Sequence, residues 1–227
     1  MTGRELILGR LRAALGDHPP TPATAHPEHR PGTATVDLDL LTDRLTDYRA
    51  TVHHCSAPQL PDVLDPILRG RRVVIPPGLP RHWLPASVAV TPDQDLTAEE
   101  IAGCDGVVTG AAVAVAETGT IILDAGPDQG RRIISLLPDL HICVLWTHQV
   151  VTTVPEALTR VDPRNPLTWI SGPSATSDIE LNRVEGVHEP RNLHVVIVAG
   201  ADASSSPALG DNPSDASAAD PTGTRLG

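Results

Sequence analysis

The chain of 227 residues contains no lysine and no phenylalanine, and Tyr48 is its single tyrosine. Because all 17 basic side chains are arginine, Schiff-base chemistry, a P-loop lysine and a lysine general base are excluded. The scarcity of aromatic side chains also excludes a stacking platform for single-stranded nucleic acid. The 28 acidic residues give a formal charge of −11, which argues against a protein that neutralises phosphate backbones.

Cysteine is scarce, and the three thiols, Cys55, Cys104 and Cys143, form no Cys-x-x-Cys pair. This spacing argues against an iron–sulfur cluster or a zinc site built by the chain alone, and against a disulfide framework. Cys143 stands in an apolar run, which is typical of a buried core thiol. The sequence has no apolar run of the ~20 residues that span a bilayer and no signal-peptide pattern, so we expect a cytoplasmic protein without a membrane span.

Composition divides the chain into three parts. Residues 1–35 are expected to form an amphipathic helix and then a proline-rich linker, because a capping box at Thr2 and Glu5 precedes an apolar stripe. Residues 201–227 consist almost entirely of Ser, Ala, Asp, Pro and Gly, a composition typical of a disordered tail. Residues 36–200 are therefore expected to form one folded domain.

Within residues 36–200, helical and strand patterns alternate. The expected helices cover 38–48, 60–68 and 130–137 and begin near 97 and 153, and the expected strands cover 51–55, 72–75, 87–90, 106–109, 120–123, 141–146, 167–170 and 194–198. This alternation predicts an α/β fold with a mainly parallel sheet that is covered on both faces. In such sheets ligands bind at the carboxyl ends of the strands.

The densest chemical signal is Glu117, the single charge in the otherwise apolar and small-residue run 106–123. A carboxylate between apolar residues at a strand–turn junction suits general acid–base or nucleophilic chemistry. The alternative is that the carboxylate caps the turn by accepting a hydrogen bond from one of the neighbouring threonines. The ligand-binding candidates around Glu117 are Thr109, Thr118, Gly119 and Thr120.

A second signal lies in residues 171–180, where a glycine turn precedes several hydroxyl groups. A glycine turn that leads into a helix N-terminus offers backbone N–H groups to an anion, which makes Gly172, Ser174 and Thr176 ligand-binding candidates. Asp178 is a catalytic candidate, or a first-turn acid that complements the helix dipole. Glu180 fits a capping box with the serine three residues earlier, which favours a structural role.

A third signal is the loop 186–191, ahead of the last predicted strand. His188 is a candidate acid–base residue, because imidazole titrates near neutral pH. Arg191 is a candidate ligand for a carboxylate or a phosphate, since the guanidinium fork matches two oxygens. Alternatively, Arg191 pairs with Asp178 or Glu180 and fixes the loop.

Two further patterns favour structural roles. The run His53-His54-Cys55 is expected in a core strand rather than in a metal site, because no spaced partner accompanies it. Arg131 and Arg132 are expected on a solvated helix face. No metal-binding residue is therefore predicted.

Together, three segments resemble the lactate utilization protein C family, which is built on the LUD domain. They are Glu117-Thr-Gly-Thr-Ile, Gly172-Pro-Ser-Ala-Thr-Ser-Asp-Ile-Glu180 and Gly186-Val-His-Glu-Pro-Arg191. Their combination in this order is specific, whereas any one segment alone is weak. The resemblance covers residues 100–200 best, and the chain departs from the family at Glu189, where glycine is usual.

The resemblance implies a fold and a pathway. The fold is the single three-layer α/β sandwich of the ribose-phosphate isomerases, glucosamine-phosphate deaminases and CoA transferases. The pathway is the bacterial oxidation of L-lactate to pyruvate, in which this chain is a cluster-free accessory or substrate-handling subunit. Iron–sulfur clusters are then expected on partner proteins, and this chain binds no cofactor of its own.

Another function stays open beside that one. CoA transferases carry a nucleophilic glutamate in a Glu-x-Gly turn, and Glu117 stands in a similar turn. The alternative is therefore a self-sufficient enzyme of the CoA-transferase or sugar-phosphate-isomerase type that uses Glu117, although a fold does not confer a reaction. In both cases a cleft for a small anionic ligand is expected between Thr109 and the segments 117–120, 172–178 and 188–191.

Overall fold

The computed structural model describes residues 3–15, 36–173, 175–176, 184–185 and 190–200. It divides into two compact units, Met1–Thr33 and Ala34–Gly227. In the first unit, α1 (Gly3–Leu15) is helical as the sequence predicts. The predicted linker after this helix and the predicted tail lie outside the described residues, and the three-part domain division stays a prediction. None of the described helices is long and apolar enough to cross a lipid bilayer.

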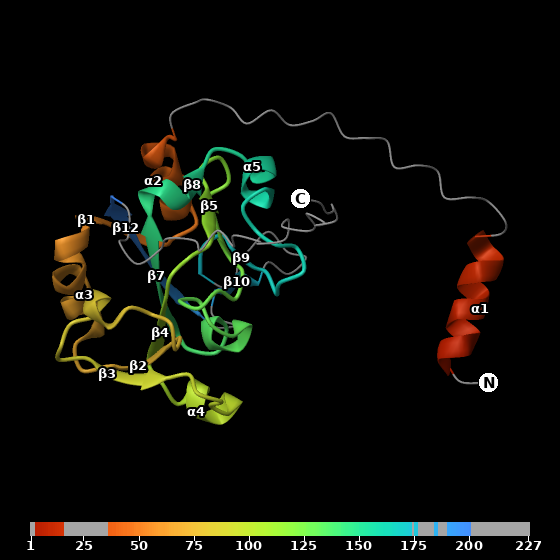
Figure 1. Ribbon diagram of the computed structural model, residues 1–227, viewed down its shortest axis with the longest axis horizontal. Helices are drawn as coiled ribbons and strands as arrows, with labels where there is room; N and C mark the ends of the chain where they lie inside the picture. The colour runs from red at the N-terminus through yellow and green to blue at the C-terminus, as the bar shows by residue number, and fades with distance from the viewer. Residues whose placement is uncertain (1–2, 16–35, 174, 177–183, 186–189, 201–227) are drawn as a thin grey trace, which may run out of the picture. The chain divides into compact units, whose positions relative to one another are not determined.

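The second unit is built on a six-stranded sheet in which all neighbouring strands are parallel (Figure 1). The strand order is β1-β12-β7-β4-β2-β3. The bounds are β1 Thr51–Ser56, β12 Asn192–Ala199, β7 Leu140–Trp146, β4 Gly106–Thr109, β2 Arg72–Ile75 and β3 Ala89–Pro92. The prediction of an α/β fold with a mainly parallel sheet is confirmed, although β3 begins later than the expected 87–90.

One face of this central sheet is covered by α3 (Leu60–Leu68), with the short 3-10 helices η1 (Ala57–Gln59) and η2 (Arg81–Trp83) beside it. Leucines at every fourth position of α3 point to one side of the helix, where they are fully buried. They pack in one cluster with alternate residues of β7 and β12. The apolar period of four therefore fixes which side of α3 meets the sheet.

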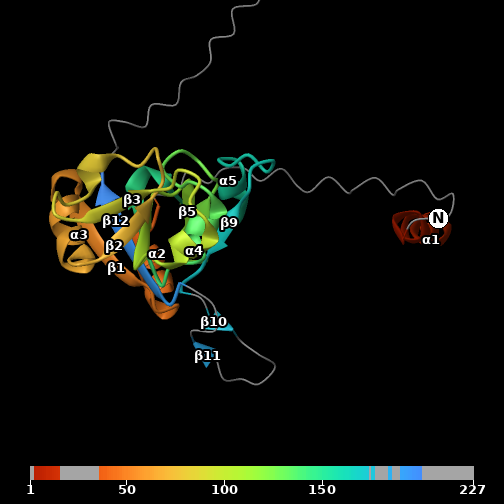
Figure 2. The ribbon, with the colours of Figure 1, turned by 90° about the horizontal axis from the view of Figure 1, so that it is seen from below.

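The opposite face is covered by α2 (Leu38–Asp47) and a second sheet (Figures 1 and 2). The Asp37 carboxylate caps the start of α2 by accepting from the Leu40 N–H at 2.9 Å. Leu41 and Leu45 are fully buried and share one core cluster with residues of both sheets. The layers are therefore α3, the central sheet, and then α2 together with the second sheet.

The second sheet was not anticipated from the sequence. Its order is β8-β5-β6-β9, and its bounds are β8 Val150–Val151, β5 Val113–Val115, β6 Thr120–Leu123 and β9 Thr168–Ile170. Strand β6 pairs antiparallel with β5 and β9, while β5 pairs parallel with β8. The short helix α5 (Val154–Leu158) packs on this sheet. The stated kinship with the isomerase and CoA-transferase sandwich stays a prediction.

The sequence-based prediction of a helix over 130–137 is wrong. This stretch contains only the 3-10 helix η3 (Arg132–Ser135), because Gly130 has a φ of 68° and the chain must enter β7 at Leu140. Arg131 and Arg132 are both exposed, as predicted, although the face they occupy is not that of an α-helix. The Arg131 guanidinium forms a two-pronged ion pair with Asp93, whose side chain is 1% exposed.

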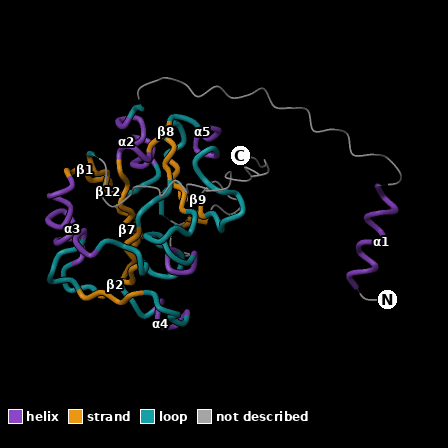
Figure 3. The backbone as a smooth tube through the Cα atoms, viewed as in Figure 1, coloured by secondary structure: helices purple, strands orange, loops and turns teal. Residues whose placement is uncertain are grey.

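The remaining short elements mostly connect these layers. Helix α4 (Ala98–Ala102) starts at the predicted capping box, in which Thr97 and Glu100 bind each other's backbone N–H groups. The 3-10 helix η4 (Thr147–Gln149) follows β7. Strands β10 (Ala175–Thr176) and β11 (Val184–Glu185) form a separate antiparallel pair (Figure 2). Loops and turns, teal in Figure 3, join the elements of the second unit.

A small polar group interrupts the core between β4 and β7. Thr109 Oγ1 lies 2.8 Å from His141 Nε2, and both side chains are fully buried. Burial lowers the pKa of His141 to about 4 and raises the pKa of Cys143 to about 12, so imidazole and thiol are both neutral at pH 7. Cys143 is therefore the buried thiol that the sequence predicts, without the character of a nucleophile.

We expect His141 to make the fold acid-sensitive. Its pKa in the fold lies below the ordinary value of 6.5, so the stability it supports is complete above pH 6.5 and falls as the pH drops toward 4. Between pH 7 and pH 5 the free energy of unfolding should fall by about 2 kcal/mol from this group. Urea unfolding at both pH values measures the loss. The loss of stability should be smaller in His141→Gln. It should be unchanged in the control variant His148→Gln, because His148 is exposed. Equal losses in the wild type and both variants would refute the assignment.

Candidate functional site

Glu117 lies in the tight turn between β5 and β6. Its backbone N–H donates to Thr152 O at 3.1 Å, which fixes the turn against the segment after β8. The side chain is exposed, and its carboxylate makes no hydrogen bond to another described residue. The alternative of a turn cap, with Thr118 or Thr120 as donor, is therefore not what the structure shows, and the carboxylate is accessible from solvent.

This turn lies directly on helix α2. Gly119 has a φ of 60°, and a Cβ placed on it would stand 2.6 Å from Arg44 Cβ and 3.2 Å from Leu45 N. Only glycine combines this backbone conformation with such a close approach. Gly119 thus brings the Glu117 turn and the second half of α2 together, which explains why a glycine follows Glu117 so closely.

A row of hydroxyl groups stands beside this contact. Thr118 Oγ1 donates to Thr120 Oγ1 at 2.8 Å, and Thr120 Oγ1 lies 2.9 Å from Ser171 Oγ. Gly172 comes next, with a φ of 101°, and a Cβ on it would stand 2.6 Å from Tyr48 Cβ. The predicted segments around 117–120 and 172 are therefore brought together, and both rest on α2 or on the residue that ends it.

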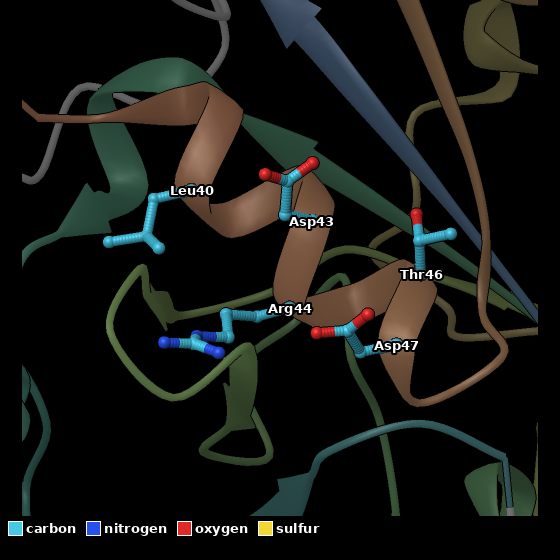
Figure 4. A pocket seen from close by; sticks show the side chains of 5 residues that line it. All are labelled: Leu40, Asp43, Arg44, Thr46 and Asp47. Carbon is cyan, nitrogen blue, oxygen red and sulfur yellow. The ribbon is translucent and has the colours of Figure 1, made fainter.

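Arg44 is the part of this site that the sequence analysis missed. Its side chain is exposed, and its guanidinium has no ion pair or hydrogen bond with another described residue. Figure 4 shows it extending away from α2, where it lines a pocket of about 400 Å³. The other described lining residues are Leu40, Asp43, Thr46 and Asp47. We call Arg44, Glu117, Thr118, Thr120 and Ser171 the Glu117 site.

The Glu117 site does not stand where the sequence predicts a ligand. It lies on the α2 layer rather than at the carboxyl ends of the central strands, because the β5–β6 hairpin folds back over α2. Thr109 does end a central strand, but its fully buried hydroxyl is bound to His141 and does not line the site. Within the described structure, Thr109 therefore has a core role.

Arg191 and Thr109, two residues of the predicted cleft, lie apart. Arg191 Nε donates to Asp139 Oδ1 at 2.5 Å. Asp178 and Glu180 lie outside the described residues, so the loop-fixing alternative stays a prediction. Residue 192 pairs with Leu140 at the amino end of β7, whereas Thr109 pairs with Cys143. At ~3.3 Å per residue, Arg191 and Thr109 differ by at least about 10 Å along the strands.

The structure describes no side chain for four other predicted site residues. Ser174, Asp178 and His188 lie outside the described residues. Thr176 belongs to β10, of which only the backbone is described. The ligand-binding role of Arg191 and the catalytic roles of Asp178 and His188 stay predictions.

The LUD domain sequence profile matches residues 41–198, which include both sheets and the Glu117 site. This chain belongs to the LUD domain family. The match extends from α2 to β12, so the LUD domain includes Arg44 as well as the predicted Glu117 turn. The family resemblance seen in the sequence is thereby confirmed.

Similar proteins support this membership. This chain is 44% identical to lactate utilization protein C of Deinococcus radiodurans over 198 residues, which cover 85% of this chain and 93% of that protein. It is 32% identical to lactate utilization protein C of Bacillus subtilis over 99 residues, 40% of this chain and 41% of that protein. The crystal structure of a DUF162 family protein from D. radiodurans superposes with a TM-score of 0.62 at 44% identity, covering 71% of this chain and 95% of that one.

Adding one methyl group to Gly119 tests its contact with α2. Gly119→Ala should lower the free energy of unfolding by about 1–3 kcal/mol more than Gly70→Ala, because the new Cβ collides with α2. Gly70 is the matched control, since its φ is 74° and nothing lies within 4 Å of a Cβ placed there. Urea denaturation of both variants measures the difference. Equal losses would mean that the turn does not rest on α2.

Proposed function

We propose that this LUD domain takes part in lactate utilization and binds a small hydroxy or oxo acid for that process. The observation that carries the proposal is that the turn with the exposed Glu117 carboxylate and the hydroxyls of Thr118, Thr120 and Ser171 rests on the part of α2 that carries Arg44, whose guanidinium has no described partner. The similar proteins of D. radiodurans and B. subtilis, both named lactate utilization protein C, support the pathway.

The chemistry of the Glu117 site suits such a ligand. A 2-hydroxy acid presents a carboxylate and a neighbouring hydroxyl group. Arg44 binds the carboxylate by charge-assisted hydrogen bonds, and the hydroxyl of Ser171 supplies a donor for the second oxygen when Thr120 is the donor between them. Glu117 accepts the hydrogen bond of the ligand hydroxyl, which is the group that loses its proton when L-lactate becomes pyruvate.

In this proposal the electrons pass to iron–sulfur partner proteins in the cytoplasm, and this chain is the substrate-handling subunit. Cys104 and Cys143 are buried, and Cys55 is half-buried in β1. In the described ranges, no three His, Cys, Asp or Glu side chains gather in a way that holds a metal ion. These placements are compatible with a division between substrate handling on this chain and electron transfer on partners.

Growth on lactate tests the pathway and Glu117 together. A strain that lacks the gene should not grow on L-lactate as sole carbon source, and the wild-type gene should restore growth. Glu117→Gln should not restore growth, because the amide cannot accept a proton, although the exposed variant folds. Immunoblotting confirms that the variant accumulates, and growth on pyruvate is the control. Growth of the deletion strain on L-lactate, without a second lactate-oxidising route, would refute the pathway.

Ligand affinity tests which arginine binds the carboxylate. Arg44→Gln should weaken binding of L-lactate or pyruvate by about tenfold to a hundredfold, the usual loss for a charge-assisted hydrogen bond. Arg191→Gln is the matched comparison, because Arg191 already pairs with Asp139. Isothermal titration calorimetry measures both affinities. A loss in Arg191→Gln alone would return the ligand to the loop 186–191 that the sequence indicates.

A second candidate function rests on the exposure of Glu117. A glutamate nucleophile of the CoA-transferase type must be accessible, and the Glu117 side chain is exposed in its turn. Incubation of the purified chain with an acyl-CoA, followed by mass spectrometry, separates the two functions. An adduct on Glu117 that is missing in Glu117→Gln would select the self-sufficient enzyme over the substrate-handling subunit.

A further inference from the structure

A second pocket, of about 370 Å³, opens at the amino ends of four central strands. Arg71 and Asp105 line it just ahead of β2 and β4, Asp139 lies ahead of β7, and Asn192 begins β12. Its volume falls within the range of ~300–1,000 Å³ that is typical of small-molecule sites. Neither the sequence signals nor the Glu117 site involves this pocket, apart from the Arg191–Asp139 ion pair at its edge.

His194 is the histidine that lines this pocket. Its ring stacks on His53 of the neighbouring strand, with centroids 5.3 Å apart and an angle of 7° between the planes. His194 Nδ1 lies 3.0 Å from His53 Nε2, so one ring donates to the other. The second nitrogen of His194, Nε2, has no hydrogen-bond partner among the described residues and is available to a ligand.

Arg71 is the second basic group of the pocket. One guanidinium nitrogen, Nη1, donates to Ile67 O at 2.7 Å. This bond holds the side chain in place, and no described carboxylate pairs with it. The other N–H groups of Arg71 therefore have no described acceptor. A guanidinium in this state favours a ligand that brings its own negative oxygens.

The two carboxylates of the pocket are already engaged by donors of the chain. Asp139 accepts from Arg191 Nε at 2.5 Å and from Asn192 Nδ2 at 3.3 Å. Asp105 accepts from the Arg72 backbone N–H at 2.7 Å. The Cys104 thiol, also in the lining, donates to Glu100 O at 3.4 Å. The lining groups with unused donors are thus Arg71 and His194, while Asp105 retains acceptor sites.

The electrostatic potential at His194 is positive, which also favours an anion. Burial, then His53 and then Arg71, lower the pKa of His194 to about 4, and no carboxylate raises it. Burial, followed by the charge of His54, also lowers the pKa of His53. Asp105 and Asp139 therefore do not neutralise the positive potential that Arg71 creates at the ring.

We propose that the amino-end pocket is a second ligand site, which binds a small oxyanion between Arg71 and His194. The guanidinium supplies two parallel donors, and Nε2 of His194 supplies a third when it carries a proton. An anion offsets the positive potential, so its binding raises the pKa of His194 toward the ordinary value. The oxyanion is the phosphate of a phosphorylated compound or the carboxylate of a small acid.

This site is independent of the proposed function. His194 and His53 point to the α3 face of the central sheet, in the same alternation as Val196 and Val198, whereas the Glu117 site stands on α2 at the other face. Loss of one site therefore leaves the other intact. A failure of oxyanion binding here would not touch the role of Glu117 in lactate utilization.

Histidine NMR of the full-length chain tests the proposal. Inorganic phosphate and L-lactate are titrated separately at pH 6 and pH 8 and at constant ionic strength, and the His194 signals are assigned with His194→Gln. We expect a saturable shift of these signals and a higher His194 pKa in the presence of the bound anion. A response to phosphate alone indicates a phosphorylated ligand, and a response to lactate indicates a carboxylate.

Two arginine variants complete the test. Arg71→Gln should weaken anion binding by about tenfold or more. Arg69→Gln should bind as the wild type does, because Arg69 is exposed and pairs with Asp65. Both positions are exposed, so the variants fold. The proposal is wrong if neither anion shifts the His194 signals, or if Arg71→Gln binds as tightly as Arg69→Gln.

Discussion

The burial of β7 on both faces is the constraint on which the rest of the structure depends. All seven residues of this strand are buried. Ile142, Val144 and Trp146 pack with α3, whereas Cys143 and Leu145 pack with α2 and the second sheet. A strand that is apolar on both sides requires a covering layer on each. The α2 layer carries the Glu117 site, and the amino end of β7 borders the second pocket, so both sites derive their positions from this strand.

The sequence predicts those parts of the fold that depend on short-range patterns. The apolar period of four gives α3, the capping box gives the start of α4, and the uninterrupted apolar run gives β7. Where a short segment depends on distant partners, the patterns fail. Strand β8 has two residues and forms only because β5 lies beside it. The stretch 130–137 has helical spacing, but it begins at Gly130, whose positive φ is not helical.

The same distinction explains what the sequence revealed of the Glu117 site. Glu117 and Gly119 stand out because a charge and a glycine interrupt an apolar run, which is a local signal. Arg44 has no such signal, since an exposed arginine on an amphipathic helix is ordinary. Its place in the site comes from the contact with Gly119, a residue far along the chain that only the folded hairpin brings near. The ion pair of the exposed Arg131 also left no signal in the sequence, because its partner Asp93 belongs to a segment that sequence spacing does not connect to it.

Each of the two sites contains an arginine. In a chain with 28 acidic and 17 basic residues, carboxylates outnumber the arginines that could pair with them. Arg69, Arg131, Arg164 and Arg191 indeed pair with aspartates. Arg44 and Arg71, like Arg72 and Arg81, pair with no described carboxylate, but Arg44 and Arg71 also line pockets together with acidic residues. A guanidinium that is left unneutralised in so acidic a chain retains its attraction for an external anion, and the absence of lysine leaves this task to arginine.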